Sequence, residues 1–289
     1  MIGNEDSVFG SARQASPVRA PFLRRHPVAA YFGLTFAISW ASAFFVAAPH
    51  LLHGEPLPRL TGILMFPAML LGPSATGILL TRLHDGPGGL RRLFSSMGRI
   101  RLPLRWFGAL LIPPALILAI LLAFEKFLSP VYAPNRFWVG LLFGIPAGFL
   151  EEIGWMGFAF PKMRHNSAAL GAAILLGLLW GLWHLPVINF LGTAVPHGAY
   201  WFPFFLAFGA AMTAMRVLFA WLYTNTESVL LCQLLHAFST GSLVIFSPPA
   251  VTAAREALWY AVYAAALWLL VVVLWGARGA SLAPKNSLV

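Results

Sequence analysis

Residues 137–160 read FWVGLLFGIPAGFLEEIGWMGFAF, an apolar run that contains two adjacent glutamates, Glu151 and Glu152. A helix needs about 20 apolar residues to cross the hydrocarbon core of a membrane, so this run predicts a membrane span. A carboxylate at that depth is costly unless it is paired or hydrated, which makes it a candidate for function. The alternative is a structural pair that is hydrogen-bonded to neighbouring helices.

Three glycines, Gly140, Gly144 and Gly148, recur every four residues along this run. Such a stripe lets a second helix approach closely. The next step of four reaches Glu152, and Glu151 lies about 100° around the helix from it. Both glutamates are therefore expected to face the interior of a bundle. Adjacent carboxylates in a low dielectric oppose each other's ionisation, which would suit one of them to act as a general base near neutral pH.

The composition predicts that most of the chain lies in a membrane. Of its 289 residues, 59% are hydrophobic and 10% are charged, whereas soluble proteins carry about 25% charged residues. We predict an all-α, polytopic membrane helix bundle of about eight transmembrane helices over residues 28–276. Residues 1–27 are predicted to be a disordered cytoplasmic tail, and residues 277–289 a second cytoplasmic tail.

The predicted spans are the apolar runs of the sequence, at 28–48, 60–80, 106–124, 137–160, 170–190, 202–222, 228–246 and 257–275. Between the second and third runs, residues 82–105 mix arginines with large apolar side chains. This stretch is either an amphipathic segment in the membrane interface or a basic cytoplasmic loop.

The formal net charge of +10 favours anionic membrane lipid as a partner over nucleic acid, because the basic residues lie between apolar spans. Their distribution predicts that both termini are cytoplasmic, and we expect a bacterial inner membrane. The connection at 223–227 carries no Lys or Arg, and Arg216 is expected to snorkel towards that side. A single cysteine, Cys232, excludes an intrachain disulfide.

Two histidines also fall within predicted spans, His184 in the fifth and His236 in the seventh. A carboxylate and two imidazoles can activate a water directly or through a zinc ion, and the sequence leaves both routes open. The remaining histidines fall in tails or loops and are expected to be surface groups: His26, His50, His53, His84, His165 and His197.

Three motifs resemble those of the CPBP intramembrane proteases, which include type II CAAX prenyl endopeptidases and bacteriocin-processing and immunity proteins. The segment Glu151-Glu152-Ile-Gly-Trp-Met-Gly-Phe resembles motif one. Trp180 and His184, followed by Leu-Pro, resemble motif two, and His236 with Thr240 resembles the last motif. The resemblance covers residues 137–246 and predicts a protease-like core there.

The resemblance implies a role for each motif residue. Glu151 would be the general base that activates water, and Glu152 would support it or bind the substrate backbone. His184 and His236 would orient the water or stabilise the oxyanion, and Thr240 would stand where the family has an oxyanion-stabilising Asn. The implied fold is an eight-helix bundle with a water-filled cavity.

The same resemblance leaves the cofactor open. Glu151, His184 and His236 would be the ligands of a zinc ion, and the other reading is a metal-independent site. The implied substrate is a membrane-associated peptide or protein, and the oligomeric state is not indicated.

Two residues depart from the family pattern. Motif one usually has an Arg where this chain has Met156, and Thr240 is shorter than Asn. Lys162 or Arg164, just beyond the helix, is expected to replace the missing guanidinium. These departures keep open a catalytically impaired pseudoprotease that acts as a membrane binding or immunity protein. A transporter or proton relay is a third reading, but no repeat relates the two halves of the chain.

Overall fold

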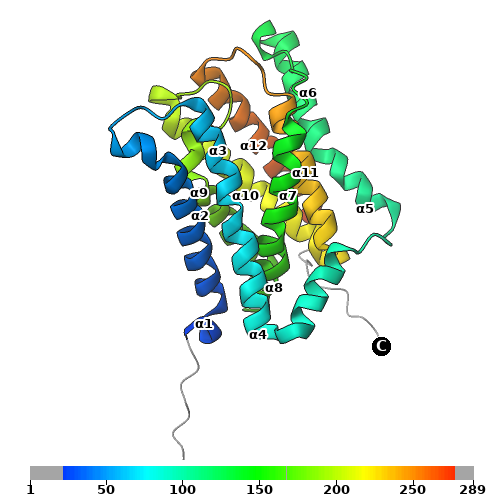
Figure 1. Cartoon of the computed structure of the whole chain (residues 1–289). Coiled ribbons are helices and arrows are strands. Elements are labelled where there is room, and N and C mark those ends of the chain that lie inside the picture. Colours follow the sequence, from blue (N-terminus) through cyan, green and yellow to red (C-terminus); the bar gives the residue numbers. More distant parts are fainter. Residues whose placement is uncertain (1–21, 167, 277–289) are drawn as a thin grey trace, which may run out of the picture.

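The computed structural model describes residues 22–166 and 168–276 and shows a bundle of helices (Figure 1). Within those residues there is no β-strand, so the predicted all-α fold is confirmed. Residues 1–21 of the N-terminal tail predicted for 1–27, and the whole tail predicted for 277–289, lie outside the described residues. Helix α1 (Phe22–Arg25) already forms a turn, so the described part of the N-terminal segment is not a disordered tail.

The other helices follow the predicted apolar runs. In chain order they are α2 (Pro27–Leu52), α3 (Arg59–Met69), α4 (Leu71–Met97), α5 (Leu104–Gly108), α6 (Ile112–Phe127), α7 (Gly140–Gly154), α8 (Phe160–Asn166), α9 (Ala169–Trp183), α10 (Trp201–Thr226), α11 (Val229–Ile245) and α12 (Ala253–Gly276). A π-helical turn, Trp155–Ala159, joins α7 to α8.

Five helical segments among the described residues are long and apolar enough to cross a membrane. They are Pro27–Leu52, Arg59–Met97, Leu104–Phe127, Gly198–Thr226 and Ala253–Leu274. Helices α9 and α11 are apolar but shorter. The architecture is therefore a polytopic helical bundle, as the composition predicted.

The second predicted span extends further than expected. Helix α4 runs on to Met97 and bends at Gly86, whose φ of 66° lies in the left-handed region that glycine tolerates. Beyond the bend, Leu93 is buried while Arg91 and Arg92 are exposed. This part of the basic stretch is thus an amphipathic helix and not a loop.

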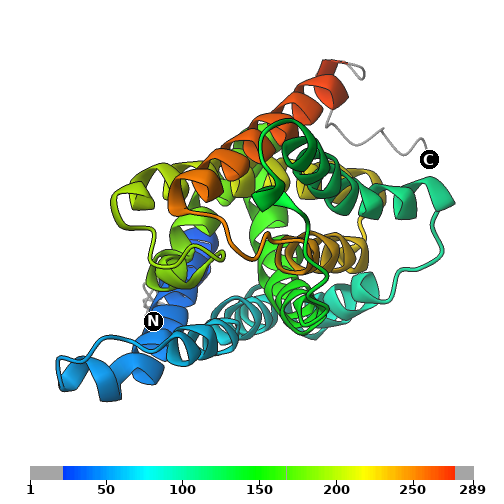
Figure 2. The same ribbon diagram turned by 90° about the horizontal axis from the view of Figure 1, so that it is seen from above.

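Helices α7 and α11 lie side by side near the centre of the bundle (Figures 1 and 2). A Cβ on Gly140 would come within 2.6 Å of the carbonyl oxygen of Gly241, and one on Gly144 within 2.5 Å of that of Ala237. Gly148 meets the backbone of α11 in the same way. The glycine stripe is therefore the contact surface between the two helices, as predicted.

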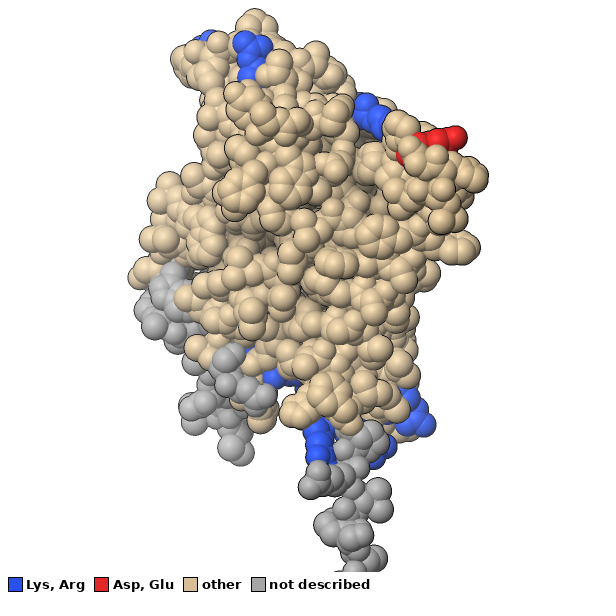
Figure 3. Space-filling model, turned by 90° about the vertical axis from the view of Figure 1, so that its left-hand side faces the viewer, with Lys and Arg blue, Asp and Glu red and all other residues tan. Residues whose placement is uncertain are grey.

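The surface of the bundle is suited to lipid. The face in Figure 3 has a broad belt without charged side chains, and Lys and Arg lie at its two ends. Large apolar side chains elsewhere are also exposed, among them Phe45 (82%), Leu142 (73%) and Val272 (63%). Exposed apolar surface of this extent is typical of contact with a membrane. The chain is an integral membrane protein.

Arg216 does not snorkel to the membrane surface, so that prediction is wrong: its relative exposure is 0%. The connection after α10, which has no Lys or Arg, instead faces Arg99, which follows α4. Nη1 of Arg99 lies 3.6 Å from Oε2 of Glu227 and donates to the carbonyl of Thr226 at 3.2 Å. The basic group at this end therefore comes from another segment of the chain.

A second buried carboxylate, Glu256, lies in the first turn of α12. It accepts hydrogen bonds from the backbone N–H groups of Thr193 and Ala194, each at 2.8 Å, and lies 3.2 Å from Nε2 of His197. His197 is 1% exposed, so its prediction as a surface group is wrong. The carboxylate fixes the connection between α9 and α10, a contact that sequence spacing does not reveal.

Candidate active site

Glu151 is held in the bundle by two tryptophans. Its carboxylate accepts hydrogen bonds at Oε2 from Nε1 of Trp155 at 3.0 Å and from Nε1 of Trp180 at 2.8 Å. Its side chain is almost wholly buried, at 3% exposure. Both donors are neutral indoles, so Glu151 is oriented without a direct ion pair among the described residues.

Glu152 instead has a cationic partner, Arg216, and a titratable one, His236. Nη1 of Arg216 donates to both of its oxygens, at 2.7 and 2.9 Å, and Nδ1 of His236 donates to Oε1 at 2.7 Å. Arg216 and Glu152 are each 0% exposed. A buried ion pair of this kind needs close geometry and further hydrogen bonds to offset its desolvation. The His236 bond supplies one.

The hydrogen bonds fix which nitrogen of each histidine carries a proton. Nδ1 of His184 lies 2.8 Å from the carbonyl oxygen of Trp180, and a carbonyl only accepts, so Nδ1 is the donor. Nδ1 of His236 is likewise the donor to the Glu152 carboxylate. In the neutral ring, Nε2 of each histidine is then left as an acceptor for a water or a substrate N–H.

Trp180 is the common neighbour of these groups. Its indole packs edge-on against the ring of His236, with centroids 5.2 Å apart, and against that of His184, 5.6 Å apart. The guanidinium of Arg216 lies over its face at 4.0 Å. The indole therefore brings Glu151, His184, His236 and Arg216 together, and three of these are predicted site residues.

Close helix packing sets this geometry. A Cβ on Gly177 of α9 would come within 3.1 Å of the Arg216 side chain on α10, so glycine there lets the two helices approach and brings Arg216 next to Trp180. After α7 the backbone changes to a π turn that begins three residues beyond Glu152, where the N–H of Trp155 donates to the backbone carbonyls of Glu151 and Glu152. Such turns are frequent at functional sites.

The two departures from the motifs have different outcomes. Met156 is buried at 0% exposure, and neither expected replacement reaches the glutamates. Lys162 donates to Asp85 at 2.7 Å, and the guanidinium of Arg164 lies over the Tyr223 ring at 5.3 Å. That prediction is wrong because both side chains lie at the end of the bundle. Arg216 instead supplies the guanidinium beside Glu152.

Thr240 lies on α11 four residues after His236 and is half-buried. One helical turn separates the two positions, so their side chains lie on one face of α11. Its predicted role next to the oxyanion stays a prediction.

The predicted zinc ligands do not form a metal site as they lie. Within residues 22–166 and 168–276, no group of three or more His, Cys, Asp and Glu side chains could hold a metal ion. Nδ1 of His236 is bound to Glu152, which leaves its Nε2 as the available ligand atom, while the Arg216 cation beside that carboxylate would repel a second cation. Zinc binding by these residues stays a prediction, and the chemistry proposed below uses only side chains.

Three contributors to the site were not predicted as site residues: Trp155, Trp180 and Arg216. Each carried a signal in the sequence. Trp155 is four residues after Glu151 and thus near it on the helix, and Trp180 belongs to motif two. Arg216 is a lone cation in an apolar span, which is itself a reason to look for a buried anionic partner.

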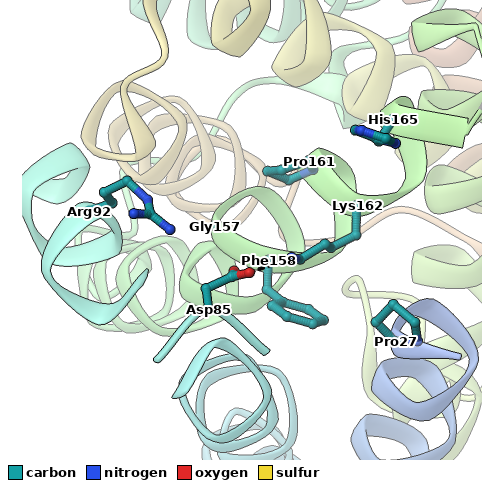
Figure 4. Close-up of a pocket in the computed structure, with 8 residues that line it drawn as sticks. All are labelled: Pro27, Asp85, Arg92, Gly157, Phe158, Pro161, Lys162 and His165. Atoms are coloured by element: carbon teal, nitrogen blue, oxygen red, sulfur yellow. Dashed lines mark hydrogen bonds and ion pairs between the residues drawn. The ribbon is translucent and has the colours of Figure 1, made fainter. Parts of the chain in front are cut away.

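A cavity of about 470 Å³ lies beside the π turn that follows the glutamates (Figure 4). Its lining comes from α4, from the start of α2 and from the turn and α8: Pro27, Asp85, Arg92, Gly157, Phe158, Pro161, Lys162 and His165. Neither Glu151 nor His184 lines it. This cavity therefore adjoins the site along the chain but does not contain it.

Comparison with known proteins agrees with the motifs. Residues 133–241 match the family model described as type II CAAX prenyl endopeptidase Rce1-like. A relative from Methanococcus maripaludis, named CAAX prenyl protease 2, is 29% identical over 140 residues, which are 44% of this chain and 51% of the relative. The chain thus spans about half the length of this relative. Over this core, which carries the glutamates and both histidines, the chain is similar to the type II CAAX prenyl endopeptidases.

Proposed function

We propose that this chain is an intramembrane endopeptidase that cleaves a peptide bond in a membrane-associated peptide or protein. The observation that supports this most is the convergence of the three motifs. Glu151 of α7, His184 at the end of α9 and the Glu152–His236 pair of α7 and α11 all lie around the Trp180 indole.

In this proposal Glu151 is the general base. Both indole donors bind Oε2, and we assign Oε1 to the attacking water. The water loses a proton to Glu151 while its oxygen bonds the scissile carbonyl carbon, giving a tetrahedral intermediate. When the C–N bond breaks, Glu151 returns the proton to the leaving amine. A buried position strengthens these electrostatic effects and excludes bulk water.

The histidines have supporting roles. His236, held through Nδ1 by Glu152, and His184, held through Nδ1 by a backbone carbonyl, each direct Nε2 at the reacting groups. A neutral ring accepts a hydrogen bond from the water, and a protonated ring donates to the developing oxyanion. We assign the Thr240 hydroxyl as a further hydrogen-bond donor to the same oxyanion.

The substrate class follows from the family and the relative's name. A prenylated peptide that ends in a Cys-aliphatic-aliphatic-X sequence is the first probe, and an unprenylated hydrophobic peptide is the second. We expect the protein to act in a bacterial inner membrane, in contact with anionic lipid. Cleavage of the prenylated probe alone would indicate a lipid-directed site, whereas cleavage of both probes would indicate a site that accepts any membrane peptide.

The test is cleavage of fluorogenic versions of both probes by the purified protein in lipid nanodiscs. We expect Glu151→Gln and His184→Ala each to lower kcat by at least about 100-fold, with thermal unfolding like that of the wild type. Glu125→Gln, at the end of α6, is the matched control and should stay active. Full activity of Glu151→Gln would exclude this mechanism.

A second candidate function is supported by Met156 and Thr240: a catalytically impaired member that binds a membrane partner or confers immunity. It predicts that the wild type binds a membrane peptide without cleaving it. Met156→Arg discriminates, because activity in that variant and none in the wild type would favour the binding protein.

A further inference from the structure

We propose that Arg216 is a positioning residue for catalysis, one that keeps Glu152 charged and holds Trp180 in place against Glu151. This inference rests on the proposed endopeptidase function. No sequence motif points to Arg216, since it lies on α10, outside the three segments that carry the glutamates and histidines.

The first support is the ion pair itself. Nη1 of Arg216 donates to both oxygens of Glu152, at 2.7 and 2.9 Å, and neither side chain is exposed. A neighbouring cation favours the ionised form of a carboxylate that is buried in a membrane protein. The anion in turn accepts the Nδ1 proton of His236 at 2.7 Å. Arg216 therefore acts on the orientation of His236 through Glu152.

The second support is the contact with Trp180. The guanidinium lies 4.0 Å from the centre of that indole and 4.6 Å from the centre of the Phe219 ring. A cation over an aromatic face is attracted by the ring. Since the same indole donates to Glu151 at 2.8 Å, the Arg216 side chain touches both Glu152 and the tryptophan that holds Glu151.

The third support is that only one nitrogen of the Arg216 guanidinium donates hydrogen bonds to described residues. Its Nε and Nη2 are buried and have no hydrogen-bond partner among the described residues. Burying unpaired donors is costly, so a residue kept only to join helices would gain from a smaller apolar side chain. A role of the Arg216 charge in the reaction explains why the protein keeps a residue with this free-energy cost.

The test is a double-mutant cycle between Arg216 and Glu152, measured with the fluorogenic peptides. Arg216→Met should lower kcat by about 100-fold with KM nearly unchanged, because the catalytic groups lose their alignment. Arg216→Lys keeps the charge but not the planar contact, and should lose about tenfold. Arg99→Met, which removes an ion pair at the end of the bundle, is the matched control and should stay active.

The double variant separates positioning from folding. If Arg216 acts in part through Glu152, the loss of activity in Arg216→Met/Glu152→Gln should be clearly smaller than the product of the two single losses, and the double variant should unfold at a higher temperature than Arg216→Met. A loss equal to the product of the two single losses would overturn the inference. So would full activity of Arg216→Lys and Arg216→Met while Glu151→Gln is inactive. Activity in Glu151→Gln would instead overturn the proposed function.

Discussion

At the scale of single residues, two adjacent glutamates have different surroundings. Glu151 accepts from two neutral indoles, whereas Glu152 faces the Arg216 cation and an imidazole. Environments that separate neighbouring carboxylates in this way assign them different tasks. Glu152 is suited to hold its charge and its neighbours, and Glu151 is suited to exchange a proton.

The bond from Trp180 to Glu151 can be tested alone. Trp180→Phe removes the N–H donor but keeps an aromatic ring next to the two histidines. A hydrogen bond to a charged group contributes about 1.5–3 kcal/mol, which corresponds to a loss of about 10–100-fold in kcat. The control is Trp268→Phe, since Trp268 donates to the carbonyl of Ala210 at 3.1 Å. Unchanged cleavage by Trp180→Phe would show that this bond does not orient the base.

At the scale of helices, the contact between α7 and α11 sets the distance between Glu152 and His236. A Cβ on Gly148 would meet backbone atoms of Gln233 and Ala237, the latter at 2.8 Å, and backbone cannot move aside. Gly148→Ala should therefore destabilise the protein by about 1–3 kcal/mol and lower cleavage as the 2.7 Å bond to His236 lengthens. Thermal unfolding in detergent and peptide cleavage measure the two effects.

Gly33 on α2 is the matched control for this substitution. A Cβ there meets no atom within 4 Å, so Gly33→Ala should leave activity unchanged and raise stability by about 0.5–1 kcal/mol, because alanine loses less freedom in a helix. Equal unfolding temperatures for the two variants would mean that the glycine stripe is not a tight contact.

The same helices show what the sequence predicts well and what it does not. The apolar runs and the stripe of Gly140, Gly144 and Gly148 predicted the spans and the inward direction of the glutamates, because both depend on periodicity along one helix. The partners of Glu152 were only partly predicted. His236 was found through its motif, but Arg216 and the contact of Glu256 with the loop depend on how distant helices pack. Periodicity carries no information on that packing.

At the scale of the whole molecule, the two ends of the bundle differ in charge. One end has the basic residues of α1, α8 and the end of α4, among them Arg24, Arg25, Arg91, Arg92, Arg99, Lys162 and Arg164. Two of these form ion pairs there, Lys162 with Asp85 and Arg99 with Glu227. The opposite end has Arg59, Lys126, Arg136 and Arg255. Excess Lys and Arg favours the cytoplasmic side. We therefore expect the first end, and with it the cavity beside Gly157, to face the cytoplasm.

Cysteine labelling can test this orientation, since Cys232 is buried and can be replaced by Ala. Ser95 and His53 are both exposed and lie at opposite ends of the bundle. In spheroplasts of a bacterial host, a membrane-impermeant maleimide should label His53→Cys at once and Ser95→Cys only after permeabilisation. The reverse labelling pattern would show that the bundle has the opposite orientation in the membrane. The cavity beside Gly157 would then face the outside of the cell, and the positive charges at that end would run against the usual bias of Lys and Arg towards the cytoplasm.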